Sequence, residues 1–292
     1  MSDLEDRWRI KEFAAIVGVP EATLRAWERR YDLLRPERSS GGFRLYSRAD
    51  ERRIRSMQAH MARGIAAAQA AALAASEPAI EIVARAEPGA LIDALIAAVD
   101  AFEATCFDRL LDAAFAHGHL TGVRDVVLPV LVEIGQRWER AEMTIGHEHF
   151  ASHLIERRLL TLARGWETGD GPLALLACPS GERHTLGLVC FGLVLADHGW
   201  RIAYLGADTP IHQIVDVSLS LGPNVVVICS LDERHLIDNA EEITDLGQRH
   251  HTILAGGGAT SGLAERLAVH HAGGDAASAA LALAEQSPGS IV

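Results

Sequence analysis

The sequence is poor in cysteine, in aromatic residues and in long apolar runs. Its 292 residues include four cysteines, which form no CxxC pair and have no regular spacing, so a reducing compartment is favoured over a disulfide framework. No uninterrupted apolar stretch reaches the roughly 18 residues that a membrane span needs. The N-terminal segment is charged and lacks the apolar core of a secretion signal. We therefore expect a cytoplasmic protein without a membrane partner.

Charge is distributed unevenly along the chain, whose net charge is −12. Residues 1–75 hold 14 Lys and Arg against 10 Asp and Glu, whereas residues 76–292 hold 13 against 29. A basic head on an acidic body indicates a nucleic-acid-binding module joined to a part that does not bind nucleic acid. A randomly uneven surface is the alternative.

Three regions of different composition predict three domains. Residues 1–75 are rich in arginine and end in an alanine run, and residues 76–168 repeat apolar residues at helical spacing, which predicts a four-helix bundle. Residues 169–292 alternate short apolar runs with helix-length segments. This alternation predicts a doubly wound, flavodoxin-like parallel sheet that is covered on both faces. Its five strands are expected at residues 173–178, 201–206, 225–230, 252–257 and 269–273.

The basic head contains two short helical segments around a glycine turn. The first segment ends at Gly18, and the second opens at Pro20 and continues through residues 23–31. This is the spacing of a helix-turn-helix, whose second helix reads the major groove of DNA. Residues 33–47 then predict a short polar hairpin. A protein-binding helical hairpin is the alternative.

Residues 8–64 resemble the winged helix-turn-helix of MerR-type transcriptional regulators, through the segments TLRAWERRY and LLRPERSSGGFRLYS. The resemblance implies that the second helix faces the major groove of operator DNA, and that the wing holds phosphate and the minor-groove edge. This division is sensible because phosphate contacts supply affinity and base contacts supply sequence preference. The candidate residues are Thr23, Arg25 and Arg29 on the helix, and Arg38, Arg44 and Tyr46 in the wing.

The loop after the first expected strand brings Glu182 close to His184, just before a helix. A carboxylate there can hold one ring nitrogen and leave the other free for a metal, although a surface histidine is the alternative. The pattern Glu182-x-His184-x-x-Gly187 resembles the cobalamin-binding signature DxHxxG, with Glu in place of Asp. The resemblance implies that His184 is the lower axial ligand of the cobalt.

Small residues at two later strand tips match the same family. The resemblance implies that Ser230, Gly256 and Gly257 lie along the nucleotide tail of cobalamin, where the backbone must approach closely. Asp232 departs from the apolar residue or Thr that the family often has after the serine.

The bundle region carries Trp138 and, ten residues later, Glu148 and His149. This segment resembles the Wx9EH motif of CarH/LitR-type photoreceptors, in which a MerR-like head, a bundle and a cobalamin domain follow in this order. The resemblance implies that Trp138 packs on the adenosyl group of adenosylcobalamin, and that Glu148 and His149 hydrogen-bond it. Half of a zinc site, from His149 and His153, is the alternative, but no third ligand is evident.

Glu139 departs from that family, which has at this position a histidine that binds cobalt after light breaks the Co–C bond. His147 or His153 is a candidate replacement. We expect a non-enzymatic, light-responsive repressor that binds operator DNA and forms a homotetramer with adenosylcobalamin in the dark. A regulator that senses cobalamin or a partner without light is the main alternative. A cobalamin-dependent methyltransferase or mutase module is the other, although the DNA module already accounts for residues 1–64.

Overall fold

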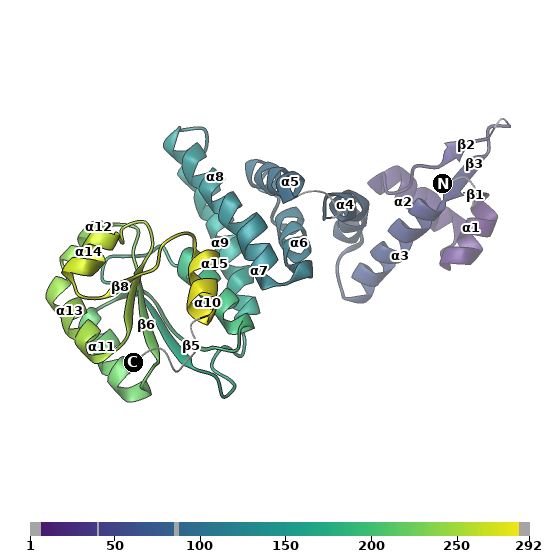
Figure 1. Cartoon of the computed structure of the whole chain (residues 1–292). Coiled ribbons are helices and arrows are strands. Elements are labelled where there is room, and N and C mark those ends of the chain that lie inside the picture. The colour runs from purple at the N-terminus through teal and green to yellow at the C-terminus, as the bar shows by residue number, and fades with distance from the viewer. Residues whose placement is uncertain (1–6, 40, 85–87, 286–292) are drawn as a thin grey trace. The chain divides into compact units, whose positions relative to one another are not determined.

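The computed structural model describes residues 7–39, 41–84 and 88–285. The chain divides into two compact units, Met1–Ala90 and Leu91–Val292, which are coloured from purple to yellow in chain order in Figure 1. None of the helices within the described ranges is long and apolar enough to cross a membrane.

The first unit begins with the expected helix-turn-helix and wing. Helix α1 (Ile10–Val17) ends at Gly18, whose φ of +67° is the left-handed conformation that glycine adopts without strain. Helix α2 (Glu21–Tyr31) follows. The wing consists of β2 (Glu37–Arg38) and β3 (Arg44–Ser47), and β1 (Arg7–Trp8) pairs with the other edge of β3. The predicted hairpin is therefore confirmed, as an antiparallel sheet in the order β1-β3-β2.

Two further helices close this unit around an apolar core. Helix α3 (Arg48–Ala62) starts at Ser47, which exchanges capping hydrogen bonds with Asp50. Helix α4 (Ala67–Ala84) contains the alanine run and extends beyond residue 75, where we expected the domain to end. It packs against α3 and α2 because its small side chains let the backbones approach closely. The core includes Phe13, Leu24, Tyr46, Ile54, Met57, Ala70, Ala71 and Ala74.

The second unit begins with the helical bundle. The described part consists of α5 (Pro88–Asp100), α6 (Ala104–Ala114), a composite rod and α9 (Ile145–Leu162). The rod joins α7 (His119–Gly122), one π-helical stretch at Val123–Val127 and α8 (Leu128–Glu139) without a break. Pro129 explains the wider π turn, since proline lacks an N–H and its ring collides with the preceding turn of a regular α-helix. Gly118, with φ +103°, separates the rod from the helical turn that precedes it.

A five-stranded parallel sheet forms the rest of this unit, and its strand order is β5-β4-β6-β7-β8. The chain runs from β4 outwards to β5 and then returns past β4 to β6. This reversal opens a crevice at the carboxyl ends of β4 and β6, where doubly wound sheets bind ligands. All five predicted strands are confirmed, as β4 (Leu173–Pro179), β5 (Arg201–Thr209), β6 (Val225–Cys229), β7 (Thr252–Ala255) and β8 (His270–His271).

Helices cover both faces of the sheet (Figure 1). One face packs against α11 (Ile211–Leu221), α12 (Glu233–Ile237), α13 (Ala240–Arg249) and α14 (Ser261–Arg266). On the other side, α10 (Leu186–Asp197) contacts α15 (Ala276–Glu285) as well as α7 and α9 of the bundle. Helix α10 is apolar on all sides because it is buried between the sheet and the bundle. The bundle is thereby held beside the carboxyl ends of β4 and β6.

Candidate functional site

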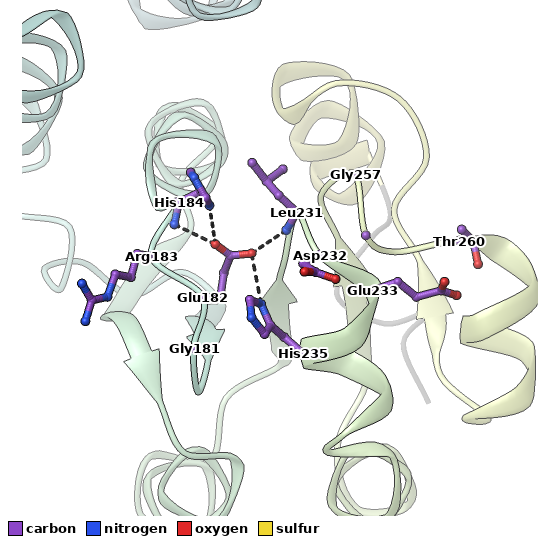
Figure 2. A pocket seen from close by; sticks show the side chains of 11 residues that line it. Gly181, Glu182, Arg183, His184, Leu231, Asp232, Glu233, His235, Gly257 and Thr260 are labelled. Atoms are coloured by element: carbon purple, nitrogen blue, oxygen red, sulfur yellow. Dashed lines mark hydrogen bonds and ion pairs between the residues drawn. The ribbon is translucent and has the colours of Figure 1, made fainter. Parts of the chain in front are cut away.

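His184 lies at the carboxyl end of β4 and is held by Glu182 (Figure 2). Its Nδ1 lies 2.7 Å from Oε1 of Glu182, and its backbone N–H donates to the same oxygen at 2.9 Å. An ionised carboxylate can only accept, so Nδ1 carries a hydrogen, and in the neutral imidazole Nε2 is the nitrogen with the lone pair. The His184 side chain is 72% exposed, whereas that of Glu182 is 1% exposed. Glu182 thus fixes the orientation of the imidazole and leaves Nε2 available to a ligand.

Residues that follow a second strand, β6, also hold Glu182 in place. Its Oε2 accepts hydrogen bonds from the backbone N–H of Leu231 at 2.6 Å and from Oγ of Ser230 at 2.9 Å, and it lies 3.6 Å from Nδ1 of His235. Burial by itself would raise the pKa of Glu182. The hydrogen bonds from His184, Leu231 and Ser230 outweigh burial and lower this pKa to about 2. The carboxylate is therefore ionised at neutral pH.

The predicted small residues divide into two roles. Ser230 is fully buried and braces Glu182, so it lines neither cavity of the site. Gly256 has φ +89°, and a Cβ there would collide with the carbonyl oxygen of Ser230. Gly257 lines the smaller cavity, and a Cβ there would meet only Leu231, at 3.7 Å. Asp232 caps α12, pairs with Arg234 and lines the smaller cavity.

Two cavities meet at His184. The larger has a volume of about 1180 Å³ and lies between α8 and α9 of the bundle and the loop after β4. The smaller, of about 510 Å³, lies between the loops that follow β4, β6 and β7 (Figure 2). Both are lined by Arg183, His184 and Leu231. A ligand bound at Nε2 of His184 can therefore occupy the larger cavity and extend into the smaller one.

The larger cavity brings together residues from distant parts of the chain. Trp138, at the end of α8, is 50% exposed, so its indole face is available for stacking. Glu148 and His149 come from the start of α9, and Glu148 accepts a hydrogen bond from Ser152 at 2.7 Å. The predicted residues that line this cavity are Trp138, Glu148, His149, His184 and Gly187.

The two candidate replacement histidines have different surroundings. His153 lines the larger cavity, as does Glu139. His147 does not line it, because its Nδ1 lies 2.8 Å from Oγ1 of Thr144 and its ring lies 4.4 Å from the ring of Phe102. Among the described residues there is no group of three or more His, Cys, Asp and Glu side chains that could hold a metal ion. The zinc interpretation therefore has no third protein ligand there.

Sequence reasoning assigned His149 to the site but missed two polar residues on the same face of α9. Ser152 and Glu156 follow His149 at helical spacing, and all three line the larger cavity. Glu156 also accepts a hydrogen bond from Oγ1 of Thr185, at 3.3 Å, which links the bundle to the loop that carries His184. Because His149 was assigned to the site, the helical spacing could have indicated that Ser152 and Glu156 lie on the same face of the helix. The missed lining residues are Phe102, Leu131, Ile134, Gly135, Ile145, Gly146, Phe150, Ser152, Glu156, Arg183, Thr185, Leu186 and Leu231.

In the first unit, the outer face of α2 presents two of the predicted cations. Arg25 and Arg29 are exposed and line a shallow hollow with Ala22 and Ala26. Thr23 is half-buried on the same helix. In the wing, Arg38 is exposed and donates to the carbonyl oxygen of Gly42 at 3.2 Å.

Tyr46 is a core residue, so the expected contact between this side chain and DNA is wrong. It has no exposed surface, and its ring stacks on Phe13 with 4.7 Å between centroids. Its hydroxyl donates to Oε2 of Glu28 at 3.2 Å, while Nε of Arg44 donates to Oε1 of the same residue at 2.9 Å. Burial, together with Glu28, raises the pKa of Tyr46 to about 12. The pair Arg44 and Tyr46 therefore fastens the wing to α2.

Three family models match the chain. The model of the MerR HTH family regulatory protein covers residues 8–77, and two B12 binding domain models cover residues 91–162 and 172–285. The HTH-type transcriptional repressor CarA of Myxococcus xanthus is 37% identical over 224 residues, which are 75% of each chain. The repressor CarH of the same organism is 30% identical over 286 residues, covering 91% of this chain and 95% of that protein.

A solved structure shares the fold of the second unit. The monomethylamine corrinoid protein of Methanosarcina barkeri matches with a TM-score of 0.56 and covers 67% of this chain and 97% of its own. The two sequences are 18% identical, so the likeness concerns the fold alone.

Proposed function

The chain belongs to the family of B12-binding, MerR-type transcriptional repressors that includes CarA and CarH, and we propose that it is a light-responsive repressor that uses adenosylcobalamin. One observation carries the proposal: side chains from α8 and α9 and the free Nε2 of His184 face the same cavity of about 1180 Å³. Such a cavity suits a ligand with two chemically different faces. The imidazole of His184 can bind one face, and the aromatic ring of Trp138 and the carboxylate of Glu148 can bind the other.

The residues at this site fit a cobalamin. Imidazole nitrogen is a common protein ligand for first-row transition metals, and Glu182 holds His184 so that Nε2 is the ring nitrogen available to a metal. The larger cavity has mostly apolar walls from the bundle, with polar groups on α9. The smaller cavity begins at His184 and passes Gly257, which leaves room for the nucleotide tail beside the backbone.

The bundle residues act on the upper group of the cofactor. When bound, adenosylcobalamin supplies a Co–C bond that green light breaks. The indole of Trp138 stacks on the adenine, the carboxylate of Glu148 accepts hydrogen bonds from the ribose hydroxyls, and His149 donates or accepts a further one. Loss of the adenosyl group would leave these three side chains without that partner. The ends of α8 and α9 would then be released to shift against the loop that Glu156 touches through Thr185.

DNA binding follows from the assembly of several chains. A single winged helix makes few contacts, so tight operator binding needs heads that are held together. The intact cofactor can promote this only if it favours the assembled conformation over the separated one. We propose that the bound chain assembles as a homotetramer in the dark. Arg25 and Arg29 of α2 then contact the major groove, with Thr23 beside them, and Arg38 and Arg44 contact phosphate.

A second candidate function is a regulator that senses cobalamin without light. The observation that favours it is Glu139, a carboxylate that lines the larger cavity at the position where the photoreceptors have a ligating histidine. Absorbance of the loaded protein before and after green light separates the two candidates. A lasting spectral change with altered DNA binding supports the photoreceptor, and unchanged DNA binding supports the cobalamin sensor.

The cofactor assignment is tested with His184→Ala and with His212→Ala, which alters an exposed histidine of α11. We expect His184→Ala to weaken cobalamin binding or to leave the cofactor with its own base as the lower ligand. His212→Ala should retain the wild-type spectrum and affinity. If His184→Ala also matches the wild type, the axial role of His184 is wrong.

The DNA assignment is tested with Arg25→Ala and Arg44→Ala. The first variant should lose sequence preference, with a penalty of roughly 1–3 kcal/mol for each lost base contact. The second should bind all sequences more weakly, because a phosphate contact carries no sequence information. Equal binding of the wild type and both variants to a promoter fragment at moderate salt would contradict the assignment of these residues to DNA binding.

A further inference from the structure

Helix α5 ends in a turn that favours glycine, but Phe102 occupies the position. The backbone N–H of Glu103 donates to the carbonyl oxygen of Ala98 at 2.9 Å, and the N–H of Phe102 donates to that of Val99 at 3.0 Å. These two hydrogen bonds form a Schellman motif, in which the residue with left-handed backbone is usually glycine. Phe102 has φ +54°. This conformation is strained for a residue with a bulky side chain.

Two other helices of the second unit end in a similar turn with a small residue. Ala141 has φ +56° after α8, and Ala268 has φ +54° after α14. Each donates its backbone N–H to the third carbonyl oxygen before it, as Phe102 does. Among the residues that the structure describes, Phe102 is the one large apolar residue with positive φ. The turn itself therefore does not require a large side chain, and the phenyl ring needs another explanation.

The Phe102 ring packs on α9 and is still half exposed. Its centroid lies 4.4 Å from that of the His147 ring and 5.2 Å from that of the Phe150 ring, so its position is fixed. Phe102 nevertheless remains 51% exposed. It lines the larger cavity, as the half-exposed Trp138 does. The strained turn thus holds a second aromatic ring at the wall of this cavity instead of in the core.

We propose that Phe102 contacts the nucleoside of the cofactor's upper group and makes the cavity selective for adenosylcobalamin over methylcobalamin. This proposal rests on the proposed cobalamin-binding function and adds a specificity-determining residue to it. An aromatic ring gains a stacking or edge contact from a purine, whereas a methyl group offers no flat surface. Backbone strain persists where the surrounding structure holds it in place, and it is concentrated at binding sites. The contact with the nucleoside offsets the strain of the turn.

The experiment titrates the full chain in the dark with adenosylcobalamin and, separately, with methylcobalamin. The ratio of the two dissociation constants is the selectivity, and we expect the wild type to bind adenosylcobalamin more tightly. Phe102→Ala should reduce this selectivity about tenfold, the factor that about 1.4 kcal/mol produces, which is in the range of one lost stacking contact with a base. The affinity for methylcobalamin should stay unchanged. A merely structural role of the ring would weaken both cofactors alike and leave the ratio as it is.

Three further variants separate the ring from the backbone that carries it. Phe102→Tyr keeps the aromatic ring and should keep the wild-type selectivity. Phe102→Gly should lose selectivity as Phe102→Ala does, but it should melt about 2–4 °C higher than Phe102→Ala, because glycine adopts positive φ without strain. Leu160→Ala removes an exposed apolar side chain of α9 that does not line the larger cavity, and it should change neither affinity. If Phe102→Ala does not fold, Phe102→Gly and Phe102→Tyr carry the test.

Wild-type selectivity in Phe102→Ala and Phe102→Gly would overturn the proposal, and so would an equal loss of affinity for both cofactors. The same holds if the wild type binds adenosylcobalamin and methylcobalamin equally well. A wild type that binds neither cofactor would instead contradict the proposed cobalamin-binding function.

Discussion

One buried carboxylate, that of Glu182, determines how His184 faces the larger cavity. The sequence indicated the pairing of these two residues, because a Glu two positions before a His can reach its ring. It could not indicate that Ser230 and the backbone of Leu231 hold the same carboxylate, since these contacts cross from β4 to β6 and depend on the strand order. We therefore treat Ser230 as a positioning residue for Glu182.

The stability of the cofactor-free protein should depend on Glu182 at acidic pH. Its pKa is about 2 in the folded chain against an ordinary value of 4.5. A carboxylate with a lowered pKa stabilises the fold fully above the ordinary value and loses this contribution as the pH falls from 4.5 towards 2. Glu182→Gln should lower the free energy of unfolding at pH 7 by about 3 kcal/mol, with a flatter dependence between pH 4.5 and 2.

Denaturant unfolding of both proteins across this pH range measures the difference. Glu265→Gln alters an exposed carboxylate on α14 and serves as the control, with a pH profile like that of the wild type. If the free energy of unfolding of Glu182→Gln and of the wild type depended on pH in the same way, the buried carboxylate would not make this contribution to stability.

Two histidines of α9 should differ in their effect on the illuminated protein. The His153 side chain lines the larger cavity, whereas the His147 ring is engaged by Thr144 and Phe102. If a bundle histidine approaches the cobalt after the adenosyl group leaves, His153 is the one in position. We expect His153→Ala to change the absorbance spectrum after green light, and His147→Ala to leave it unchanged. The reverse pattern would show that α9 rearranges in the light.

At the scale of helices and strands, prediction succeeded where periodicity alone decides the structure. Continuous apolar runs predicted the central strands β4 and β6, because the parallel sheet is covered on both faces and buries both sides of these two strands. The end of the wing was harder to predict. Tyr46 was expected on the DNA side, but β3 packs against α1, and the ring of Tyr46 stacks on Phe13. Tertiary packing, which a local pattern does not contain, determines that face.

Substitutions at the two glycines after β7 should affect different properties of the protein, stability at Gly256 and cobalamin binding at Gly257. A Cβ at Gly256 would collide with the carbonyl oxygen of Ser230, and the residue has positive φ, so Gly256→Ala should destabilise the second unit by about 1–3 kcal/mol. Gly257 has room for a side chain but lines the smaller cavity, so Gly257→Val should reduce cobalamin affinity with little loss of stability. Gly262→Ala, where a Cβ meets nothing within 4 Å, is the control for both.

Thermal unfolding and cobalamin titration measure the two effects. Equal stability of Gly256→Ala and Gly262→Ala would contradict the close approach of the loops after β6 and β7. Unchanged cobalamin affinity of Gly257→Val would show that the smaller cavity does not receive part of the cofactor.

The wing should depend on Tyr46 for stability and not for a DNA contact. Tyr46→Phe keeps the ring on Phe13 and removes only the hydrogen bond to Glu28, at a cost of about 1 kcal/mol. Tyr46→Ala should cost about 3–5 kcal/mol, as for other large buried side chains. Denaturant unfolding and DNA titration of Tyr46→Phe are the measurements. A large loss of DNA affinity without a loss of stability would restore the direct contact.

At the scale of the whole molecule, two units with different chemistry have to act together. The first unit is basic and presents α2 and the wing, and the second holds a cavity between the bundle and the sheet. Because α7 and α9 pack on α10 within the second unit, a ligand in that cavity contacts both layers. We propose that loss of this ligand changes how bundle and sheet fit together, and that the assembly depends on this change.

The most direct test is DNA binding and size-exclusion chromatography of the full chain in three states. These are cofactor-free, loaded with adenosylcobalamin in the dark, and loaded and then exposed to green light. The account predicts a larger assembly and tight operator binding in the dark loaded state alone, with a smaller species and weaker binding in the other two. If neither the oligomeric state nor the DNA affinity changed with cofactor or with light, the result would contradict the account.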